Sequence, residues 1–284
     1  MSENKIYLCA LSNIESGTCN EDCKFCTQSV KYKADIQRYR RKEVEDIVKE
    51  AIIARKNRAI GFCLVTAGTG LDDKRLDYVC RAASAIKKEL GDELSLIACN
   101  GIATLDQLKE LKKHGIENYN HNLETAQEFY NEICTTHPWE DRYQTCLNAK
   151  EAGLQLCTGG IFGLGETQEN RISMLKSIAS LEPMSVPINF FHPNEALPIV
   201  KNSISRKEAF ELIKLSREYL PNQMIMIAGG RELMFKEQEY DVFKYGANAL
   251  VVGDYLTTAG KTAQEDIDAI EALGYTIALD CKTR

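Results

Sequence analysis

Short runs of apolar and β-branched residues alternate along this chain with longer segments in which apolar positions recur among charged ones at helical spacing. This alternation is typical of repeated units in which a buried strand is followed by an amphipathic helix. The apolar runs predict eight strands, over Ile6–Leu11, Ile60–Thr66, Leu94–Asn100, Glu117–Asn122, Leu154–Thr158, Ser185–Phe190, Met224–Ala228 and Ala249–Val252. The intervening and following segments predict helices over Val44–Lys56, Lys74–Leu90, Leu105–Lys113, Arg142–Glu151, Asn170–Leu181, Arg206–Tyr219, Gln238–Tyr245 and Ala263–Leu273.

Eight strands that alternate with eight helices predict an α/β fold, a (β/α)8 barrel of the TIM type that spans residues 1–284 as a single domain. Glycines at predicted helix ends (Gly91, Gly115, Gly153, Gly246 and Gly274) suit the left-handed conformation of a cap. An open, doubly wound sheet is the alternative, because periodicity does not reveal whether a sheet closes. Both architectures place functional residues at the carboxyl ends of the strands.

The composition is that of a soluble globular protein, with 44% hydrophobic and 27% charged residues. A net charge of −6 repels a phosphate backbone, so we expect no nucleic-acid partner. No apolar run approaches the roughly 18 residues of a membrane helix. Residues 1–4 lack the basic and apolar regions of a signal peptide. We therefore expect a cytoplasmic protein with no membrane partner.

Eleven cysteines are unusual for a chain of this kind. Without a secretion signal, disulfides are not expected, and reduced thiols are available to metals. Only three cysteines are tightly clustered, as a C-x3-C-x2-C loop after the first strand, and they are Cys19, Cys23 and Cys26. Structural zinc usually takes four ligands in paired knuckles, and no second knuckle follows. Three thiolates on one loop favour a 4Fe-4S cluster with one iron open to substrate, with zinc or unrelated thiols as the alternative.

The loop, with the aromatic Phe25 before its last cysteine, resembles the signature of radical S-adenosylmethionine (SAM) enzymes. In that superfamily the open iron binds SAM, and electron transfer splits the sulfonium into methionine and a 5′-deoxyadenosyl radical. Such chemistry needs a cofactor, because no side-chain base can deprotonate an unactivated methyl group.

A longer resemblance, from about Leu8 to Gly274, is to the biotin synthase family. It is carried by the segments Gly17–Gln28, Tyr119–Thr125, Gly159–Thr167, Ser185–Asn189 and Ala228–Glu232. The resemblance implies insertion of sulfur into dethiobiotin, with a 4Fe-4S cluster that cleaves SAM and a 2Fe-2S cluster that donates a bridging sulfide. It also implies a homodimer.

The same resemblance implies the ligands of the 2Fe-2S cluster: Cys63, Cys99, Cys157 and Arg231. The three cysteines lie near the ends of predicted strands, although a lone cysteine in a strand is more often a small buried hydrophobe. Arg231 would not be predicted from its chemistry, because a guanidinium stays protonated and lacks a lone pair for a metal. An ion pair is the plainer interpretation of Arg231.

Contacts to SAM and substrate are also implied by the resemblance. Asn120 and Asn122 lie two apart on one strand and so share a face, which suits hydrogen bonding to a ribose or to the ureido ring of dethiobiotin. Turn capping is the alternative for this pair. Asn189 matches a substrate amide contact, and Arg142 matches a contact to the SAM carboxylate. Glu124 stands where the family usually has aspartate, and its carboxylate is expected to bind ribose hydroxyls.

Two glycine-containing turns complete the predicted SAM site. Ala67 and Gly68 match a turn where bare backbone approaches the methionine part of SAM. Ile161 lies in a segment, Gly159–Glu166, that runs along the adenine in radical SAM enzymes. A dinucleotide-binding fingerprint is the weaker interpretation of this segment, because its third glycine is missing. The loop His192–Pro198 departs from the family pattern.

A basic run follows the cluster loop in this net acidic chain: Lys31, Lys33, Arg38, Arg40, Arg41 and Lys42. It is either a solvated stretch or a docking surface for an acidic flavodoxin or ferredoxin that delivers electrons. Two other functions stay open from sequence alone. One is a radical SAM barrel enzyme without sulfur insertion, which would lack the second cluster. The other is an iron–sulfur sensor or electron carrier, which would not cleave SAM.

Overall fold

The computed structural model describes residues 4–280, so Cys281 and the first three residues lie outside it. Its parallel strands lie in the order β1, β2, β3, β4, β5, β7, β8 and β9, and β1 also pairs with β9. This pairing closes the sheet into a barrel and excludes the open, doubly wound alternative. The strands are β1 (Lys5–Glu15), β2 (Gly61–Thr66), β3 (Ser95–Cys99), β4 (Asn118–Asn120), β5 (Gln155–Cys157), β6 (Gly160–Phe162), β7 (Ser185–Phe190), β8 (Met224–Ile227) and β9 (Ala249–Val251).

All eight predicted strands are confirmed, with two additions. β6 follows β5 after two residues and also pairs with β7, so β5 and β6 together fill one position of the barrel. A short strand, β10 (Thr276–Ile277), pairs with the first residues of β1.

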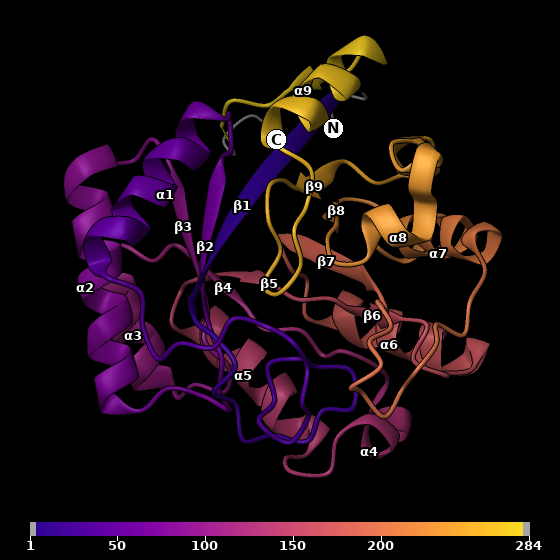
Figure 1. Cartoon of the computed structure of the whole chain (residues 1–284), viewed down its shortest axis with the longest axis horizontal. Coiled ribbons are helices and arrows are strands. Elements are labelled where there is room, and N and C mark those ends of the chain that lie inside the picture. Colours follow the sequence, from indigo (N-terminus) through magenta and orange to yellow (C-terminus); the bar gives the residue numbers. More distant parts are fainter. Residues whose placement is uncertain (1–3, 281–284) are drawn as a thin grey trace.

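Helices surround the barrel in the (β/α)8 manner (Figure 1). They are α1 (Val44–Lys56), α2 (Asp73–Leu90), α3 (Leu105–Lys113), α4 (Tyr130–Ile133), α5 (Trp139–Glu151), α6 (Gln168–Ser180), α7 (Arg206–Tyr219), α8 (Arg231–Phe235) and α9 (Ala263–Ala272). Thr104, Thr167, Ser205 and Thr262 begin α3, α6, α7 and α9 with capping boxes, which satisfy amide groups in the first turn. No helix in residues 4–280 is both long enough and apolar enough to cross a membrane.

One predicted helix is wrong. The segment Gln238–Tyr245 forms two short 3-10 turns, η2 (Lys236–Gln238) and η3 (Asp241–Tyr245), instead of an α-helix. Lys236 adopts a φ of 50°, a left-handed conformation that ends α8 and prevents one continuous helix. The short turn η1 (Gln127–Phe129) and α4 were not predicted, because segments this short carry no periodic signal.

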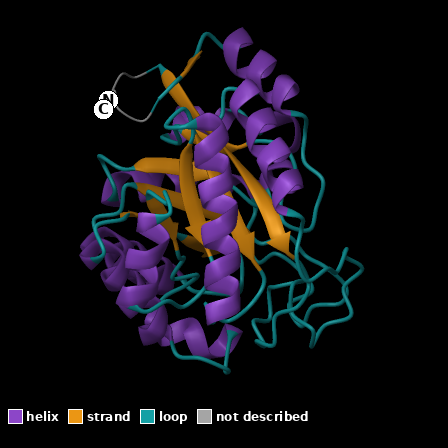
Figure 2. Cartoon of the chain, turned by 90° about the vertical axis from the view of Figure 1, so that its left-hand side faces the viewer, coloured by secondary structure: helices purple, strands orange, loops and turns teal. Residues whose placement is uncertain are grey.

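The strands separate a packed outer layer from a hollow interior. Outward-facing strand residues such as Leu8, Leu64 and Leu96 are fully buried against the helices. The alternate residues face a central cavity, since successive strand side chains point to opposite faces. This inward set includes Cys9, Leu11, Gly61, Cys63, Val65, Ser95, Ile97, Cys99, Asn118, Asn120, Cys157, Ser185, Pro187, Asn189, Met224, Met226 and Val251. The loops that follow the strands gather beyond the arrowheads (Figure 2).

Gly230, which follows β8, packs closely against the end of β7, and Gly274, which follows α9, offers a comparison without such a contact. Gly230 and Gly274 have almost the same positive φ, 82° and 83°. A Cβ at Gly230 would lie 1.9 Å from the Phe190 carbonyl oxygen, whereas a Cβ at Gly274 would meet nothing within 4 Å. We predict that Gly274→Ala lowers the free energy of unfolding by about 1–2 kcal/mol, from left-handed strain alone.

The Gly230→Ala variant should lose a further ~1–3 kcal/mol, because the β7 backbone has to move to admit the methyl group. Urea unfolding of both variants measures the difference. Equal losses in the two variants would contradict the close approach of Gly230 to Phe190.

Candidate active site

A cavity of about 460 Å³ runs through the interior of the barrel, from strand starts such as Gly61 and Met224 to strand ends such as Cys99 and Cys157. Its wall carries three predicted cluster cysteines, Cys63, Cys99 and Cys157, together with the amides of Asn120 and Asn189. Phe25 and Ile161, two of the residues predicted to contact SAM, also line it. Apolar side chains such as Ile97, Met226 and Val251 line much of this cavity, so the polar groups stand out against an apolar wall.

The loop with Cys19, Cys23 and Cys26 folds back on itself beside this cavity. The Cys19 amide donates to the Gln28 carbonyl oxygen at 3.2 Å, and the Val30 amide donates to the Cys19 carbonyl oxygen at 2.8 Å. The Cys26 amide donates to the Cys23 carbonyl oxygen at 3.0 Å. Burial raises the pKa of Cys26 to about 12, and the nearby Cys19 thiol adds to the effect. The loop therefore brings the three predicted thiols together, as a metal cluster requires.

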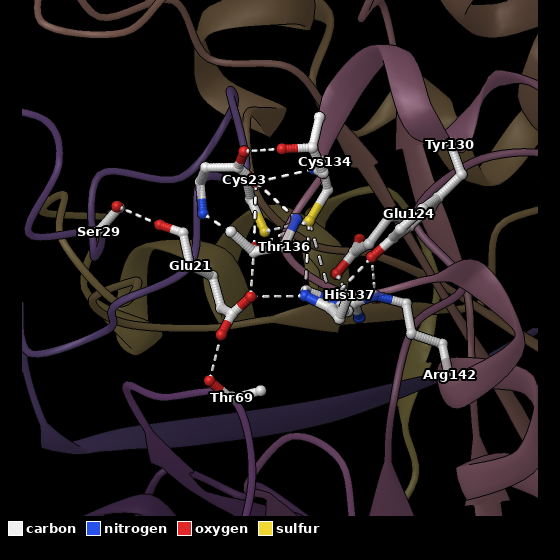
Figure 3. Close-up of polar contacts among 12 residues, drawn as sticks. Glu21, Cys23, Ser29, Thr69, Glu124, Tyr130, Cys134, Thr136, His137 and Arg142 are labelled. Carbon is white, nitrogen blue, oxygen red and sulfur yellow. Dashed lines mark hydrogen bonds and ion pairs between the residues drawn. The ribbon is translucent and has the colours of Figure 1, made fainter.

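Side chains far along the sequence hold this loop in place (Figure 3). The Asp22 carboxylate accepts a hydrogen bond from the Thr135 amide at 2.8 Å. Glu21 accepts hydrogen bonds from the hydroxyls of Thr69 and Thr136, and its Oε2 lies 2.7 Å from His137 Nδ1. These contacts could not be predicted, because they join Glu21 and Asp22 to residues between 48 and 116 positions away and no sequence pattern links them.

A further thiol, Cys134, lies against the cluster loop. Its Sγ is 3.6 Å from Cys23 Sγ and 3.5 Å from His137 Nδ1 (Figure 3). The hydrogen bond that Cys23 donates lowers the pKa of Cys134 to about 4. Cys134 was not predicted as a site residue, since it is not part of a cysteine motif.

Glu124 and Arg142 form a buried ion pair on the other side of Cys134. Arg142 Nη1 lies 3.5 Å from Glu124 Oε1 and donates to the Asn122 carbonyl oxygen at 2.9 Å. Burial raises the pKa of Glu124, and Arg142 opposes that rise. Glu124 Oε2 is buried and has no hydrogen-bond partner within residues 4–280. The site thus presents a buried acceptor that a ligand hydroxyl or amine can satisfy.

The remaining predicted contacts divide into cavity residues and backbone supports. Asn122 lines the cavity while its Oδ1 accepts from the Gly159 amide at 3.2 Å. Asn189 Oδ1 accepts from the Gly229 amide at 2.9 Å. Ala67 and Gly68 lie outside the set of cavity-lining residues. The Ala67 carbonyl oxygen accepts from Thr18 Oγ1 at 3.2 Å, which ties this turn to the cluster loop.

The second set of thiols lies deeper in the barrel. A hydrogen bond with Cys99 and burial raise the pKa of Cys63, and the Cys157 and Cys9 thiols raise it further. Cys99 Sγ also lies 3.5 Å from Asn120 Oδ1. The structure therefore brings Cys63, Cys99 and Cys157 together, and it places Cys9 in the same environment.

Arg231 does not join them, so its predicted place in the ligand set is not supported. The side chain is 1% exposed but is absent from the cavity lining, and it begins α8 in the helix layer. Its Nη1 and Nη2 donate to the two carboxylate oxygens of Asp266 on α9, at 2.7 and 3.0 Å. The plainer interpretation, a buried ion pair, describes the observed contacts.

Comparisons with known proteins agree with this geometry. Residues 14–178 match the model of the radical SAM superfamily, and residues 187–276 match that of the biotin and thiamin synthesis associated domain. A biotin synthase from Aliarcobacter butzleri is 82% identical over 99% of both chains, and one from a Nitratiruptor species is 63% identical over 98% of this chain and 99% of its own. This chain belongs to the biotin synthase family.

Structural neighbours place this biotin synthase family member within a wider group of barrels. A methylornithine synthase superposes with a TM-score of 0.83 at 19% identity, covering 97% of this chain and 84% of the other. An FeFe-hydrogenase maturase from Carboxydothermus hydrogenoformans gives 0.82 at 22% identity, covering 97% and 68%. At these identities the likeness supports the radical SAM barrel fold alone.

The buried ion pair of Arg231 generates a stability prediction. Replacing Arg231 with methionine leaves the Asp266 carboxylate buried and uncompensated, which should lower the free energy of unfolding by about 3–5 kcal/mol. The double variant Arg231→Met, Asp266→Asn should recover part of this loss, because residue 266 is then neutral and Glu239 keeps its ion pair with Lys261.

Urea unfolding measures both effects. The matched control is Arg206→Met, which breaks a more exposed pair with Glu237 and should cost less than ~1 kcal/mol. An Arg231→Met variant as stable as this control would contradict a structural role for the ion pair.

Proposed function

We propose that this protein inserts sulfur into dethiobiotin to form biotin, by using a 4Fe-4S cluster to cleave SAM and a second iron–sulfur cluster as the sulfur donor. The observation that carries the proposal is the presence of two separate thiol sets around one cavity. One set is on the loop beside the cavity and the other is in the barrel wall, with amide side chains between them. The close biotin synthase relatives support the same reaction.

The spacing of the thiols favours polynuclear clusters over single metal ions. A tetrahedral zinc ion with bonds of about 2.3 Å holds its sulfur ligands about 3.8 Å apart. Within residues 4–280, only Cys23, Cys134 and His137 bring three such ligand atoms within 4.8 Å of one another. Neither proposed cysteine set forms such a group by itself, and Cys23 is the one loop cysteine that does so, together with Cys134 and His137.

Residues beside the loop fit SAM. The unpartnered Oε2 of Glu124 offers a buried acceptor for ribose hydroxyls, and its longer side chain serves in place of the usual aspartate. Arg142, buried on α5, offers the positive charge that a carboxylate requires. Phe25 and Ile161 supply apolar wall next to these groups. When bound, SAM and the loop cluster supply a 5′-deoxyadenosyl radical, and the second cluster supplies the sulfur.

The rest of the cavity fits dethiobiotin. Asn120 and Asn189 present amides that can both donate to and accept from a ureido ring. His192 and Asn194 of the loop that departs from the family pattern also line the cavity, so this loop contributes to the substrate wall. The enclosed apolar surface holds the aliphatic carbons of the substrate and limits the access of water to a radical.

The alternative of a radical SAM barrel without sulfur insertion, and that of an iron–sulfur sensor, are distinguished by one anaerobic experiment. The protein is incubated with SAM, reductant and dethiobiotin, and biotin and 5′-deoxyadenosine are quantified by mass spectrometry. Sulfur insertion requires both products. Production of 5′-deoxyadenosine without biotin indicates the first alternative, and the absence of both products indicates the second.

The two thiol sets should respond differently to substitution. Cys23→Ala removes a ligand of the loop cluster, so the yield of 5′-deoxyadenosine should fall, and the yield of biotin should fall with it. The decrease should exceed the roughly 10–100-fold that is typical when a residue merely supports a ligand. Cys157→Ala should keep the 4Fe-4S signal and some 5′-deoxyadenosine, but should lose the second cluster and make no biotin. Mössbauer and visible spectroscopy of reconstituted variants check the clusters.

Cys80→Ala serves as the matched control, because Cys80 is buried on α2 and does not line the cavity. It should retain both clusters and both products. Biotin at the wild-type yield from Cys157→Ala, with an intact second-cluster spectrum, would show that the sulfur donor lies elsewhere.

The basic run after the loop supports electron delivery by an acidic flavodoxin or ferredoxin. Arg38, Arg41 and Lys42 bind Gly17, Glu15 and Glu50. Lys31, Lys33 and Arg40 are exposed and make no ion pair within residues 4–280. These three residues are therefore the ones available for steering a partner.

Reversing Lys31, Lys33 and Arg40 to glutamate should slow reduction by flavodoxin at low salt by roughly 10-fold or more, because steering acts on the association rate. Reduction by dithionite should not change. Reversal of Lys176, Lys207 and Lys214, which are exposed on α6 and α7, changes the net charge equally and is the control. Equal flavodoxin rates for both triple variants would rule out the docking surface.

The resemblance also supports a homodimer in the cytoplasm, where the thiols stay reduced. None of the cysteines in residues 4–280 forms a disulfide. Sedimentation of the anaerobically purified protein measures its oligomeric state.

A further inference from the structure

Cys9 faces the interior of the barrel from β1. It lines the cavity with Cys63, Cys99 and Cys157, and its side chain is 8% exposed. On the neighbouring strand β2, Leu11 pairs with Cys63 and Cys9 pairs with Gly61. Cys9 therefore lies one inward position below Cys63 on one side, and Cys99 lies one inward position above it on the other.

This offset does not keep the side chains apart. Cys63 and Cys99 are related by the same offset across β2 and β3, and their thiols hydrogen-bond. Cys9 and Cys63 are diagonal neighbours in the same way, and both line the cavity. Four thiols on the inner wall thus share one environment.

Gly61 keeps the space between Cys9 and Cys63 open. A Cβ at position 61 would lie 3.0 Å from Cys9 Sγ and 3.1 Å from Ile97 Cδ1, so a side chain here would crowd the sulfur. A glycine inside a strand otherwise weakens the strand, and it often marks a site where another group approaches the backbone. Here that group is a thiol on the inner wall of the barrel.

Arg231, the predicted fourth ligand, suits the cluster neither in its position nor in its chemistry. Arg231 is held by Asp266 in the helix layer, and both of its terminal nitrogens donate to that carboxylate. A protonated guanidinium offers a metal no lone pair. Iron–sulfur clusters are usually held by four cysteine thiolates, and β1, β2, β3 and β5 each present one cysteine to the cavity.

We propose that Cys9, and not Arg231, is the fourth protein ligand of the sulfur-donor cluster, which is therefore held entirely by thiolates. This inference rests on the proposed function, since it concerns the second cluster of the same site. A fourth thiolate adds a negative charge next to the irons, so the cluster should have a lower reduction potential than one with a neutral ligand in this position.

The test isolates the second cluster. In a background with Cys19, Cys23 and Cys26 all replaced by alanine, any cluster that remains after anaerobic reconstitution belongs to the barrel wall. Reconstitution is carried out at substoichiometric iron. Adding Cys9→Ala should then lower the iron and sulfide content per chain by more than roughly 10-fold, the loss that is typical when a residue merely supports a ligand. It should also change the Mössbauer spectrum of the cluster. Cys9→Ser, which offers a poorer oxygen donor of similar size, should retain cluster with an altered spectrum.

Two controls keep the result specific. Cys80→Ala in the same background should retain the full iron content and spectrum, because its thiol lies on α2 outside the cavity. Circular dichroism and thermal unfolding of apo Cys9→Ala should match those of apo Cys80→Ala, so that a lost cluster is not the result of a lost fold. If Cys9→Ala does not fold, the Cys9→Ser spectrum decides.

The outcomes separate this inference from the proposed function. If the triple-alanine background holds no cluster at all, the proposed sulfur donor fails, and the assignment of Cys9 fails with it. If that background holds a cluster and Cys9→Ala or Cys9→Ser leaves its iron content and spectrum unchanged, only the assignment of Cys9 is overturned. Loss of the cluster in Arg231→Lys with retention in Cys9→Ala would restore the arginine as the ligand.

Discussion

The pairing of β1 with β9 is the constraint on which the rest of this structure depends. Tyr7 pairs with Ala249, and Cys9 pairs with Val251, so the first and last strands of the barrel meet. Once the sheet is closed, every second residue of each strand is committed to the interior. The chemistry of the cavity is therefore set by the residues at alternate positions, and a one-residue shift in the register of β1, β2, β3 or β5 would turn the wall cysteine of that strand toward the helices.

Much of this arrangement could be predicted from the sequence. The strands, most helices and the cysteine loop are local signals, and they appear where the residue pattern places them. The residue pattern does not reveal that Arg231 lies in the helix layer. Gly230, with its left-handed backbone, turns the chain toward that layer just before Arg231. The role of Cys9 depends on the register between β1 and β2, and the contacts of Glu21 join segments that no pattern connects.

The two family models divide the sequence where the fold is continuous. The radical SAM model ends at residue 178 and the second model begins at residue 187, within β7. However, β7 pairs with β5 and β6 on one side and with β8 on the other, and β9 returns to β1. The segment matched by the second model supplies the last three barrel strands, along with Asn189, so both matched regions build one cavity wall.

The contacts that hold the cluster loop also bear on how the protein is synthesised. Asp22 and Glu21 are held by Thr135 and His137, which follow them by 113 and 116 residues. A ribosome that adds about 5–20 residues per second needs roughly 6–23 s to cover that distance. During this interval the three loop cysteines have emerged or are emerging, while the segment that orders them has not yet been made. Iron delivered before residue 137 has been made would meet a loop without these supports, so ordered cluster assembly has to follow the synthesis of that segment.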